Sequence, residues 1–307
     1  MKEAHAYWVA GHITCIFEIR DNDPDPLNKG SVGAGLSINR GVVTWVDRDP
    51  SQRGVVVSID QRNATYEESV VSRKMVELLL PESTHGVVVH HQLEIPVGMG
   101  FGASAAAAIG LAFALNDTFE LKHDSLKLWQ TAHLAEVICK TGLGDVLGLF
   151  QGGVEQRTTH GAPGIGSCRA LPRPSDDQRI MSIALGPILT KSILSSHEKR
   201  NLIIASGRDA LSRIDERVSF KELLAISRRF TNSIGLQSEK LKRLFNFLDK
   251  RNIICSQIML GNSAIILLDE KIIVEDFLEI IGSEFQNHNI ETICDSPVRK
   301  INLKKTV

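Results

Sequence analysis

The sequence predicts an α+β protein with two domains. Three observations lead to this prediction: a charge-free segment at 95–115 that begins with glycines and continues with alanines, a stretch at 161–178 rich in Gly, Pro, Ser and Arg, and a series of short strands and helices after it. A loss of periodicity in such a stretch is typical of a domain boundary. We therefore expect one domain at 1–172 and another at 173–307.

Short β-rich runs dominate the beginning of the chain. Residues 6–19 read as extended segments interrupted by Gly11 and His12, which we expect to form a turn. The valine-rich runs at 42–46 and 55–59 are separated by polar residues, and this pattern predicts a hairpin.

Two helices are expected beside the glycine-rich segment in the first domain. One covers 72–80 and is ended by Pro81, and the other covers 123–140 with Asp124 or Ser125 as its cap.

The second domain is expected to be an antiparallel sheet with helices on one face. Ser219 and Glu222 form a capping box, which marks a helix start. Strands are expected at 180–185, 188–194, 253–259, 264–268, 290–294 and 298–303, and helices at 199–214, from 219 onward, around 241–248 and at 274–286.

The overall charge excludes several classes of partner. Lys plus Arg (35) and Asp plus Glu (36) nearly cancel, so no strong field selects nucleic acid or a membrane surface. Five cysteines without CxxC spacing fit reduced thiols and make a zinc site a poor interpretation. The apolar patch at 6–10 is too short for a signal peptide, so we expect a cytoplasmic protein that acts on a small molecule.

The segment around residue 100 has the order strand, glycine loop, helix start. An apolar run leads to Pro96, after which come Gly98, Gly100 and Gly102 and then the alanines. Glycines allow a tight backbone, and the free N–H groups at a helix N-terminus stabilise a phosphate. Ser104 lies in the first turn, where its hydroxyl can reach a metal or a phosphate oxygen.

Other interpretations of this segment fit less well. It is long enough for a membrane span, but Pro96, the glycines and the high alanine content argue against one. A buried core helix explains the alanines and not the glycines. Ala103 stands where a Rossmann fingerprint needs its last glycine, and the chain has no Gly-Lys pair for a Walker A loop.

Two acidic residues follow in the sequence. Asp145 is surrounded by glycines, which predicts an exposed and tightly positioned carboxylate. Glu136 lies on the helix at 123–140, and a lone helical Glu is usually a surface acid. Its proximity to the glycine-rich segment around Asp145 favours a role in a site.

Glycines at two other places are also of interest. Gly30, Gly33 and Gly35 follow a polar segment and form either a substrate floor or an ordinary long turn. Gly261, between two expected strands, brings that hairpin close to a ligand or only supplies the turn.

These motifs together resemble a known family. Pro96-x-x-x-Gly100-Phe-Gly102-Ala-Ser104 resembles the phosphate-binding motif of the GHMP kinases. Four segments in order resemble, more narrowly, the archaeal pantoate kinase family: Gly11-His12-Ile13-Thr14, Gly30-Ser31-x-Gly33-Ala34-Gly35, Thr141-Gly-Leu-Gly-Asp145-Val and Met259-Leu-Gly-Asn262. The resemblance runs nearly end to end.

The resemblance implies a two-domain GHMP kinase fold, with an N-terminal mixed α/β domain that carries the phosphate loop and a ferredoxin-like α+β C-terminal domain. It also implies an active site between the domains and a homodimer. ATP and Mg²⁺ would be the cofactors, Ser104 and Glu136 the metal ligands, and Asp145 the catalytic base. The ATP phosphates would lie on Pro96, Gly98, Gly100, Phe101, Gly102, Ala103, Ser104 and Ala105.

The activity implied is phosphorylation of the primary hydroxyl of pantoate to 4-phosphopantoate, in coenzyme A biosynthesis of an archaeon. Candidates for binding this substrate are His12, Arg20, Ser31, Gly33, Gly35 and Gly261. A kinase of another small hydroxy acid or alcohol, such as shikimate or mevalonate, stays open. A non-catalytic ligand sensor is a further alternative, which the retention of Ser104, Glu136 and Asp145 disfavours.

The chain departs from the wider GHMP pattern at four positions. His12 stands where many members have the Lys of Ala-Pro-Gly-Lys, so a cation next to the base is absent or replaced. Ala10 stands in place of the Pro of that motif, and Ala103 in place of the first of two serines. Gly261 is almost alone where the wider family has several glycines.

Overall fold

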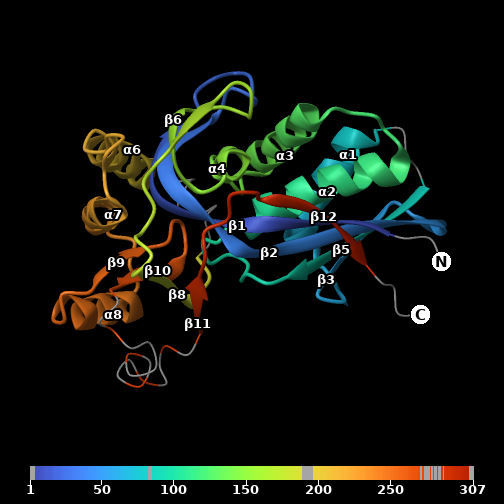
Figure 1. Cartoon of the computed structure of the whole chain (residues 1–307). Coiled ribbons are helices and arrows are strands. Elements are labelled where there is room, and N and C mark those ends of the chain that lie inside the picture. Colours follow the sequence, from blue (N-terminus) through green and yellow to red (C-terminus); the bar gives the residue numbers. More distant parts are fainter. Residues whose placement is uncertain are drawn as a thin grey trace.

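The computed structural model describes residues 4–81, 85–188, 196–269 and 287–303, with isolated positions between 272 and 285. Figure 1 shows a large twisted sheet with a layer of helices on one side and, next to it, a smaller sheet with its own helices. The α+β class predicted from the sequence is therefore confirmed, and the boundary at residue 172 stays a prediction.

The large sheet has the strand order β12-β1-β2-β5-β3-β4, and β6 pairs with both β2 and β7. All of its pairings are antiparallel except that of β3 with β5. Its strands are β1 (Ala4–Arg20), β2 (Gly30–Arg53), β3 (Val55–Ile59), β4 (Arg62–Asn63), β5 (His85–Leu93), β6 (Val154–Thr159), β7 (Ser167–Ala170) and β12 (Val298–Leu303).

One face of this sheet is covered by helices (Figure 1). Small residues let α2 approach the strands closely, and a Cβ on Gly110 would lie 3.0 Å from the Cβ of Thr44. Ile109 and Leu111 of the same helix are fully buried, and burying such a side chain contributes roughly 1.5–3 kcal/mol. The helices are α1 (Tyr66–Leu79), α2 (Ala103–Phe119), α3 (Ser125–Cys139) and α4 (Asp145–Gln151).

The smaller sheet has the strand order β11-β8-β10-β9 and is antiparallel throughout, as expected. Its strands are β8 (Arg179–Gly186), β9 (Ile254–Gln257), β10 (Asn262–Leu268) and β11 (His288–Glu291). Next to it lie α6 (His197–Leu211), α7 (Phe220–Ile234) and α8 (Glu239–Asp249), with the predicted capping box of Ser219 and Glu222 at the start of α7.

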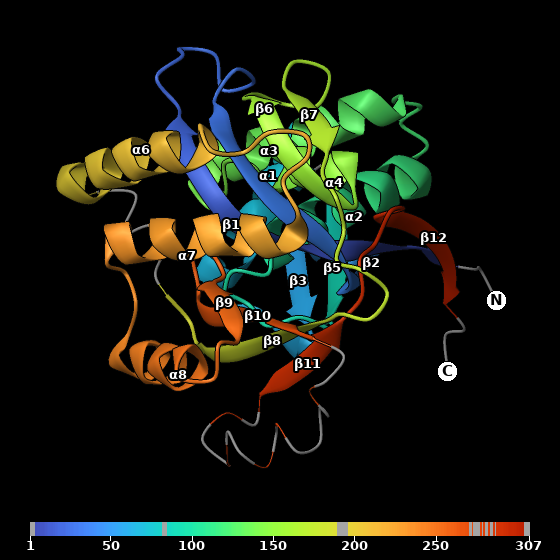
Figure 2. The ribbon, with the colours of Figure 1, turned by 60° about the vertical axis from the view of Figure 1, so that its left-hand side comes forward.

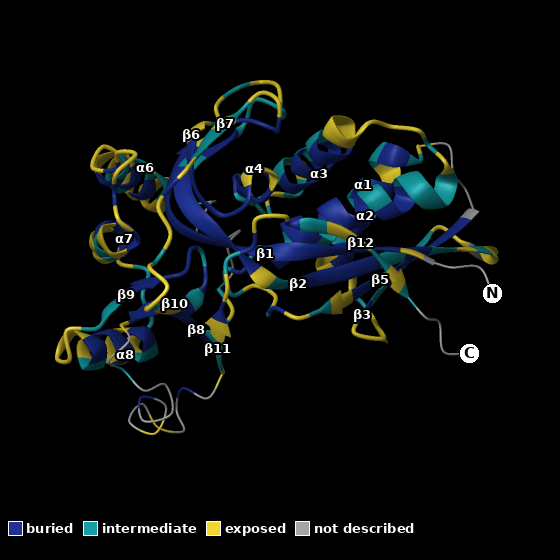
Figure 3. Ribbon diagram, viewed as in Figure 1, coloured by how far each residue is buried: buried dark blue, intermediate teal, exposed yellow. Residues whose placement is uncertain are grey.

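The prediction that helices cover one face of the smaller sheet is wrong. Alternate residues of β10 point to opposite sides, so Ile266 packs with Leu244 of α8 whereas Ile265 belongs to the core that includes Phe230 of α7. Figure 2 shows α7 and α8 on opposite sides of β9 and β10. In Figure 3 most of β1 and β2 is buried, whereas β11 and the outer sides of these helices carry exposed residues.

Two local predictions in the first half are also wrong, and the long turn expected as one alternative at residues 30–35 is not present. Gly11 and His12 lie within β1, where the register with β2 shifts, and do not form a turn. The run at 42–46 does not form a hairpin with β3, because β5 pairs between them. The glycines at 30–35 belong to strand β2, which contacts β1 on one side and β6 on the other.

The end of the chain differs from expectation as well. β12 was expected to close the second domain, but it pairs with β1 at the edge of the large sheet. Ile188 is not in a strand, and the rest of the strand expected at 188–194 lies outside the described residues, as does most of the helix expected at 274–286. No helix within the described ranges is both long and apolar enough to cross a membrane.

Candidate active site

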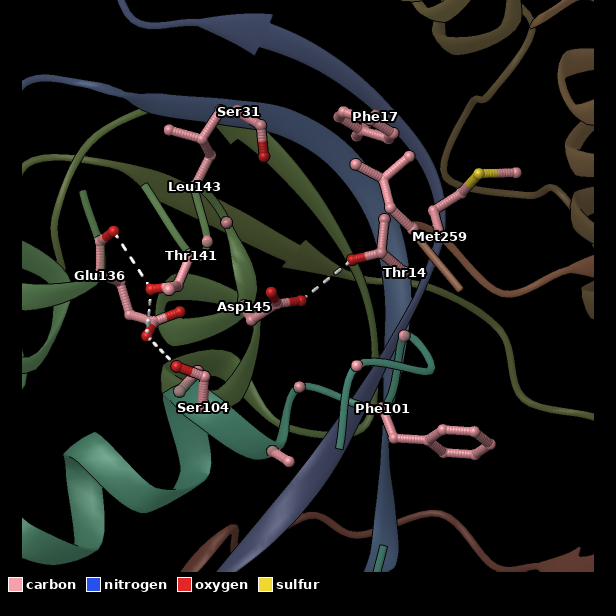
Figure 4. Close-up of a pocket in the computed structure, with 18 of the residues that line it drawn as sticks. Thr14, Phe17, Ser31, Phe101, Ser104, Glu136, Thr141, Leu143, Asp145 and Met259 are labelled. Carbon is pink, nitrogen blue, oxygen red and sulfur yellow. Dashed lines mark hydrogen bonds between the residues drawn. The ribbon is translucent and has the colours of Figure 1, made fainter. Parts of the chain in front are cut away.

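A cleft lies where the loop before α2, strand β1 and the loop before α4 meet. Its volume is about 820 Å³, which includes space open to solvent. Figure 4 shows Ser104, Glu136 and Asp145 facing this space from different elements. The sequence-predicted residues that line the cleft are Ser31, Gly98, Gly100, Phe101, Gly102, Ala103, Ser104, Ala105, Glu136 and Asp145.

The loop before α2 has the conformation that its glycines allow. Gly98, Gly100 and Gly102 have φ angles of 72°, 92° and 66°, a region that other residues rarely adopt. Gly102 precedes the first helical residue and has no side chain to cap it. The N–H groups of the first turn of α2 are therefore available to an anion, and they point from the positive end of the helix.

Glu136 forms one corner of the cleft and is almost fully buried. Ser104 Oγ donates a hydrogen bond to Glu136 Oε1, and Thr141 Oγ1 donates to the same oxygen at 2.8 Å. Burial raises the pKa of Glu136 to about 7, against the lowering effect of the two hydroxyls and with a further increase from Asp145.

These residues fit a magnesium ion. No Lys or Arg forms an ion pair with Glu136 in the part of the chain that the structure describes, so a buried carboxylate lacks a positive partner there. Ser104, Thr141 and Glu136 offer only hard oxygen donors, the type that Mg²⁺ prefers. The described residues contain no group of three or more His, Cys, Asp or Glu ligands, and Mg²⁺ commonly keeps several waters.

Asp145 forms the opposite corner and begins α4. Its side chain is 26% exposed, so it is half-buried and not exposed as the sequence suggested. His12 Nδ1 lies 2.8 Å from Asp145 Oδ1, and Thr14 Oγ1 donates to the same oxygen at 3.3 Å. Burial alone would raise the pKa of Asp145, but His12, with Arg157 and Thr14, lowers it overall. Asp145 is therefore ionised at neutral pH.

A buried charged cluster lies behind Asp145. His12 Nε2 is 3.0 Å from Glu155 Oε1, and Arg157 Nη1 donates to that oxygen at 2.5 Å. His12, Glu155 and Arg157 are at most 1% exposed. Sequence reasoning missed Thr14, Glu155 and Arg157. The alternation of side chains along a strand could have indicated Glu155 and Arg157. They are two residues apart in a strand and therefore point to the same face.

Comparison with known proteins gives the family. A family model described as GHMP kinases N terminal domain matches residues 70–153. The chain is 31% identical over 269 residues to a pantoate kinase of Thermococcus kodakarensis, covering 86% of this chain and 87% of that protein. It is 30% identical over 252 residues to a pantoate kinase of Methanospirillum hungatei, covering 82% and 83%.

The chain belongs to the pantoate kinase family of the GHMP kinases.

A solved structure supports the same family. It is described as a phosphotransferase related to the CoA biosynthesis pathway, and it superposes with a TM-score of 0.83 at 28% identity, covering 97% of this chain and 98% of that one. The two-domain GHMP kinase fold predicted from the sequence is thereby confirmed.

Four of the residues that were candidates for binding the substrate do not line the cleft. His12 contacts Asp145 from behind and does not line the cleft. Gly33 and Gly35 lie within β2, where Gly33 faces Arg157. Arg20 is outside the lining and lies 3.0 Å from Glu18.

Two further residues of this GHMP kinase chain border the phosphate loop without lining the cleft. Pro96 precedes the loop, and Val97 takes the lining position. Gly261 packs against the backbone of Met99 and Gly100, so any side chain there would collide with the loop. Met259 and Leu260, its neighbours, line the cleft instead.

Proposed function

We propose that this protein transfers the γ-phosphoryl group of ATP to the primary hydroxyl of pantoate, giving 4-phosphopantoate and ADP. The observation that carries the choice of substrate is the similarity to pantoate kinases, which extends over 86% of the chain. The arrangement of the cleft supports the chemistry, since a phosphate loop and an ionised carboxylate line the same space. The likeness to a phosphotransferase related to the CoA biosynthesis pathway supports a role of the product in that pathway.

Asp145 is the proposed catalytic base. Its Oδ1 accepts hydrogen bonds from His12 and Thr14, whereas its Oδ2 has no hydrogen-bond partner among the described residues. Oδ2 can therefore take the proton of the substrate hydroxyl as that oxygen attacks the γ-phosphorus. The loop at 98–105 would hold the ATP phosphates with its N–H groups and thereby position the phosphoryl group for attack.

Ser104 and Glu136 would hold Mg²⁺, with Thr141 orienting the Glu136 carboxylate. When bound, the ion neutralises charge on the phosphates during transfer. The pKa of Glu136 is raised to about 7, so this carboxyl group is partly protonated at neutral pH. A cation bound in this corner would favour its ionised form.

We further propose a cytoplasmic homodimer. The family resemblance supports the dimer, and five free cysteines support a reducing compartment.

The test is release of ADP with pantoate, compared at equal concentrations with shikimate, mevalonate and homoserine. We expect pantoate to give the highest kcat/KM, and product analysis to show a phosphate on the primary hydroxyl. Much faster turnover of one of the other substrates would overturn the assignment. ATP binding without turnover of any of them would favour the sensor alternative.

A further inference from the structure

Both ring nitrogens of His12 face carboxylates. Nδ1 lies 2.8 Å from Asp145 Oδ1 and Nε2 lies 3.0 Å from Glu155 Oε1. An ionised carboxylate only accepts hydrogen bonds, and a neutral imidazole carries a single N–H. If His12 were neutral, one of the two contacts would place a nitrogen lone pair against a carboxylate oxygen. With both carboxylates ionised, N–H donors on both nitrogens of His12 satisfy the two contacts.

The charges around His12 support this state. From α4 it faces Asp145, from β6 it faces Glu155, and behind Glu155 lies Arg157, which donates a hydrogen bond to Glu155 Oε1. With His12 protonated, two positive and two negative groups make the cluster neutral. Although burial lowers the pKa of His12, the bonds to Asp145 and Glu155 raise it overall.

The backbone approaches the His12 ring closely at two glycines. A Cβ on Gly35 would lie 3.0 Å from the Nε2 and Cε1 atoms of His12, and a Cβ on Gly148 would overlap Nε2. The side chain of His12 is completely buried, so water does not compete for either nitrogen. Two glycines on different elements thus fix the ring between its carboxylate partners.

We propose that His12 is a positioning residue that stays protonated throughout the reaction and, through its Nδ1–H, fixes Oδ1 of Asp145 so that Oδ2 receives the substrate proton. The reaction step rests on the proposed function, whereas the protonation state of His12 does not. As the substrate oxygen bonds to the γ-phosphorus and the bond to ADP breaks, the proton moves to Asp145 Oδ2. It leaves from there to solvent, and His12 keeps both of its protons.

Nuclear magnetic resonance of ¹⁵N-labelled histidine side chains tests the protonation state directly. The signals of His12 are assigned by their loss in His12→Asn, and we expect both of its nitrogens to show the imidazolium signature at pH 7.5. His91 is the internal contrast, because it is buried between the hydroxyls of Thr44 and Ser72, and burial lowers its pKa to about 4. A neutral signature for His12 at this pH would overturn the proposal.

Kinetics test the positioning role. We expect His12→Asn to lower kcat roughly 10- to 100-fold, the scale typical of residues that orient a reactive group, with little change in the KM for ATP. His91→Asn removes another buried histidine away from the cleft and should leave kcat unchanged. An unchanged kcat in His12→Asn would contradict the role.

Glu155→Gln tests whether the charge of His12 affects the pH dependence of kcat, which a purely structural role of His12 would not change. Losing one of its two carboxylates lowers the pKa of His12, so the fall of kcat at alkaline pH should begin at a lower pH than in the wild type. An alkaline limb that stays in place in folded Glu155→Gln would refute the link. If pantoate is not phosphorylated but His12 is doubly protonated, the proposed function fails and the charge assignment stands.

Discussion

The two acidic corners of the cleft differ in what neutralises them. Glu136 is almost fully buried and receives hydrogen bonds only from hydroxyls, and burial raises its pKa to about 7. Asp145 is half-buried and receives a hydrogen bond from His12, and its pKa is lowered. Burial raises the pKa of a carboxyl group, and hydrogen bonds to the ionised form or a nearby positive charge lower it. Asp145 thus has His12 as a partner, whereas Glu136 has no Lys or Arg partner among the described residues.

This difference supports the proposed roles of the two carboxylates. Carboxyl groups whose pKa values are pushed apart commonly divide the work in an active site. In the proposed roles Asp145, which contacts His12, is the base, and Glu136, which has no ion pair with Lys or Arg among the described residues, holds the metal ion.

The largest expected effect comes from Asp145→Asn, which removes the base and keeps the shape. We expect kcat to fall by roughly 10²- to 10⁴-fold while ATP binding is retained. The matched control is Asp117→Asn, because the Asp117 side chain has a similar exposure, 24%, and pairs with Tyr7 and Lys300 away from the cleft. Near-normal turnover by Asp145→Asn would exclude Asp145 as the base.

Glu136→Gln should act on the metal requirement. Because a ligand carboxylate is lost, we expect the Mg²⁺ concentration for half-maximal activity to rise by about 10-fold or more. In the wild type this concentration should also rise as the pH falls below about 7, since protons then compete with the ion for Glu136. The control is Glu18→Gln, equally buried but paired with Arg20 and Arg208. An unchanged Mg²⁺ titration of Glu136→Gln would remove Glu136 from the metal site.

Thr141→Val should have a smaller effect in the same corner. The variant removes the 2.8 Å hydrogen bond to Glu136, so the pKa of Glu136 should rise further and the Mg²⁺ requirement at pH 7 should increase roughly three- to tenfold. Thr131→Val, which removes a hydroxyl bonded to the Lys127 carbonyl in the same helix, is the control. Equal titrations for the two variants would show that Thr141 has no part in orienting Glu136.

His91→Gln should change stability and not activity. In the folded protein the pKa of His91 is lowered to about 4 from 6.5. As the pH falls, His91 is therefore protonated in the unfolded chain at a higher pH than in the folded protein. The contribution of His91 to the free energy of unfolding is fully present above pH 6.5. It is lost as the pH falls toward 4, by up to roughly 3 kcal/mol. Urea unfolding at pH 7 and pH 5 should show a weaker pH dependence in the variant. Identical pH dependence in both proteins would mean that His91 is not buried in its neutral form.

The local parts of this structure could be predicted from the sequence, and the non-local parts could not. The glycine loop with α2 and the capping box at Ser219 depend on residues a few positions apart. The pairing of His12 with Asp145 and with Glu155 spans 133 and 143 residues. The glycines next to Asp145 give no sign of such distant partners, which explains why Asp145 was expected to be exposed.

The same distinction applies to the strands. The valine-rich runs were recognised, but their neighbours in the sheet depend on packing across the whole chain. β3 therefore pairs in parallel with β5, although a hairpin with the run at 42–46 was expected, and β12 pairs with β1, although it was expected to close the second domain.

A crystal structure with pantoate, Mg²⁺ and a non-hydrolysable ATP analogue tests the division between the two corners most directly. We predict that the primary hydroxyl of pantoate lies within hydrogen-bond distance of Asp145 Oδ2, with the metal ion on Ser104 and Glu136. A hydroxyl bound at Glu136, or a metal ion bound directly to Asp145, would contradict the account.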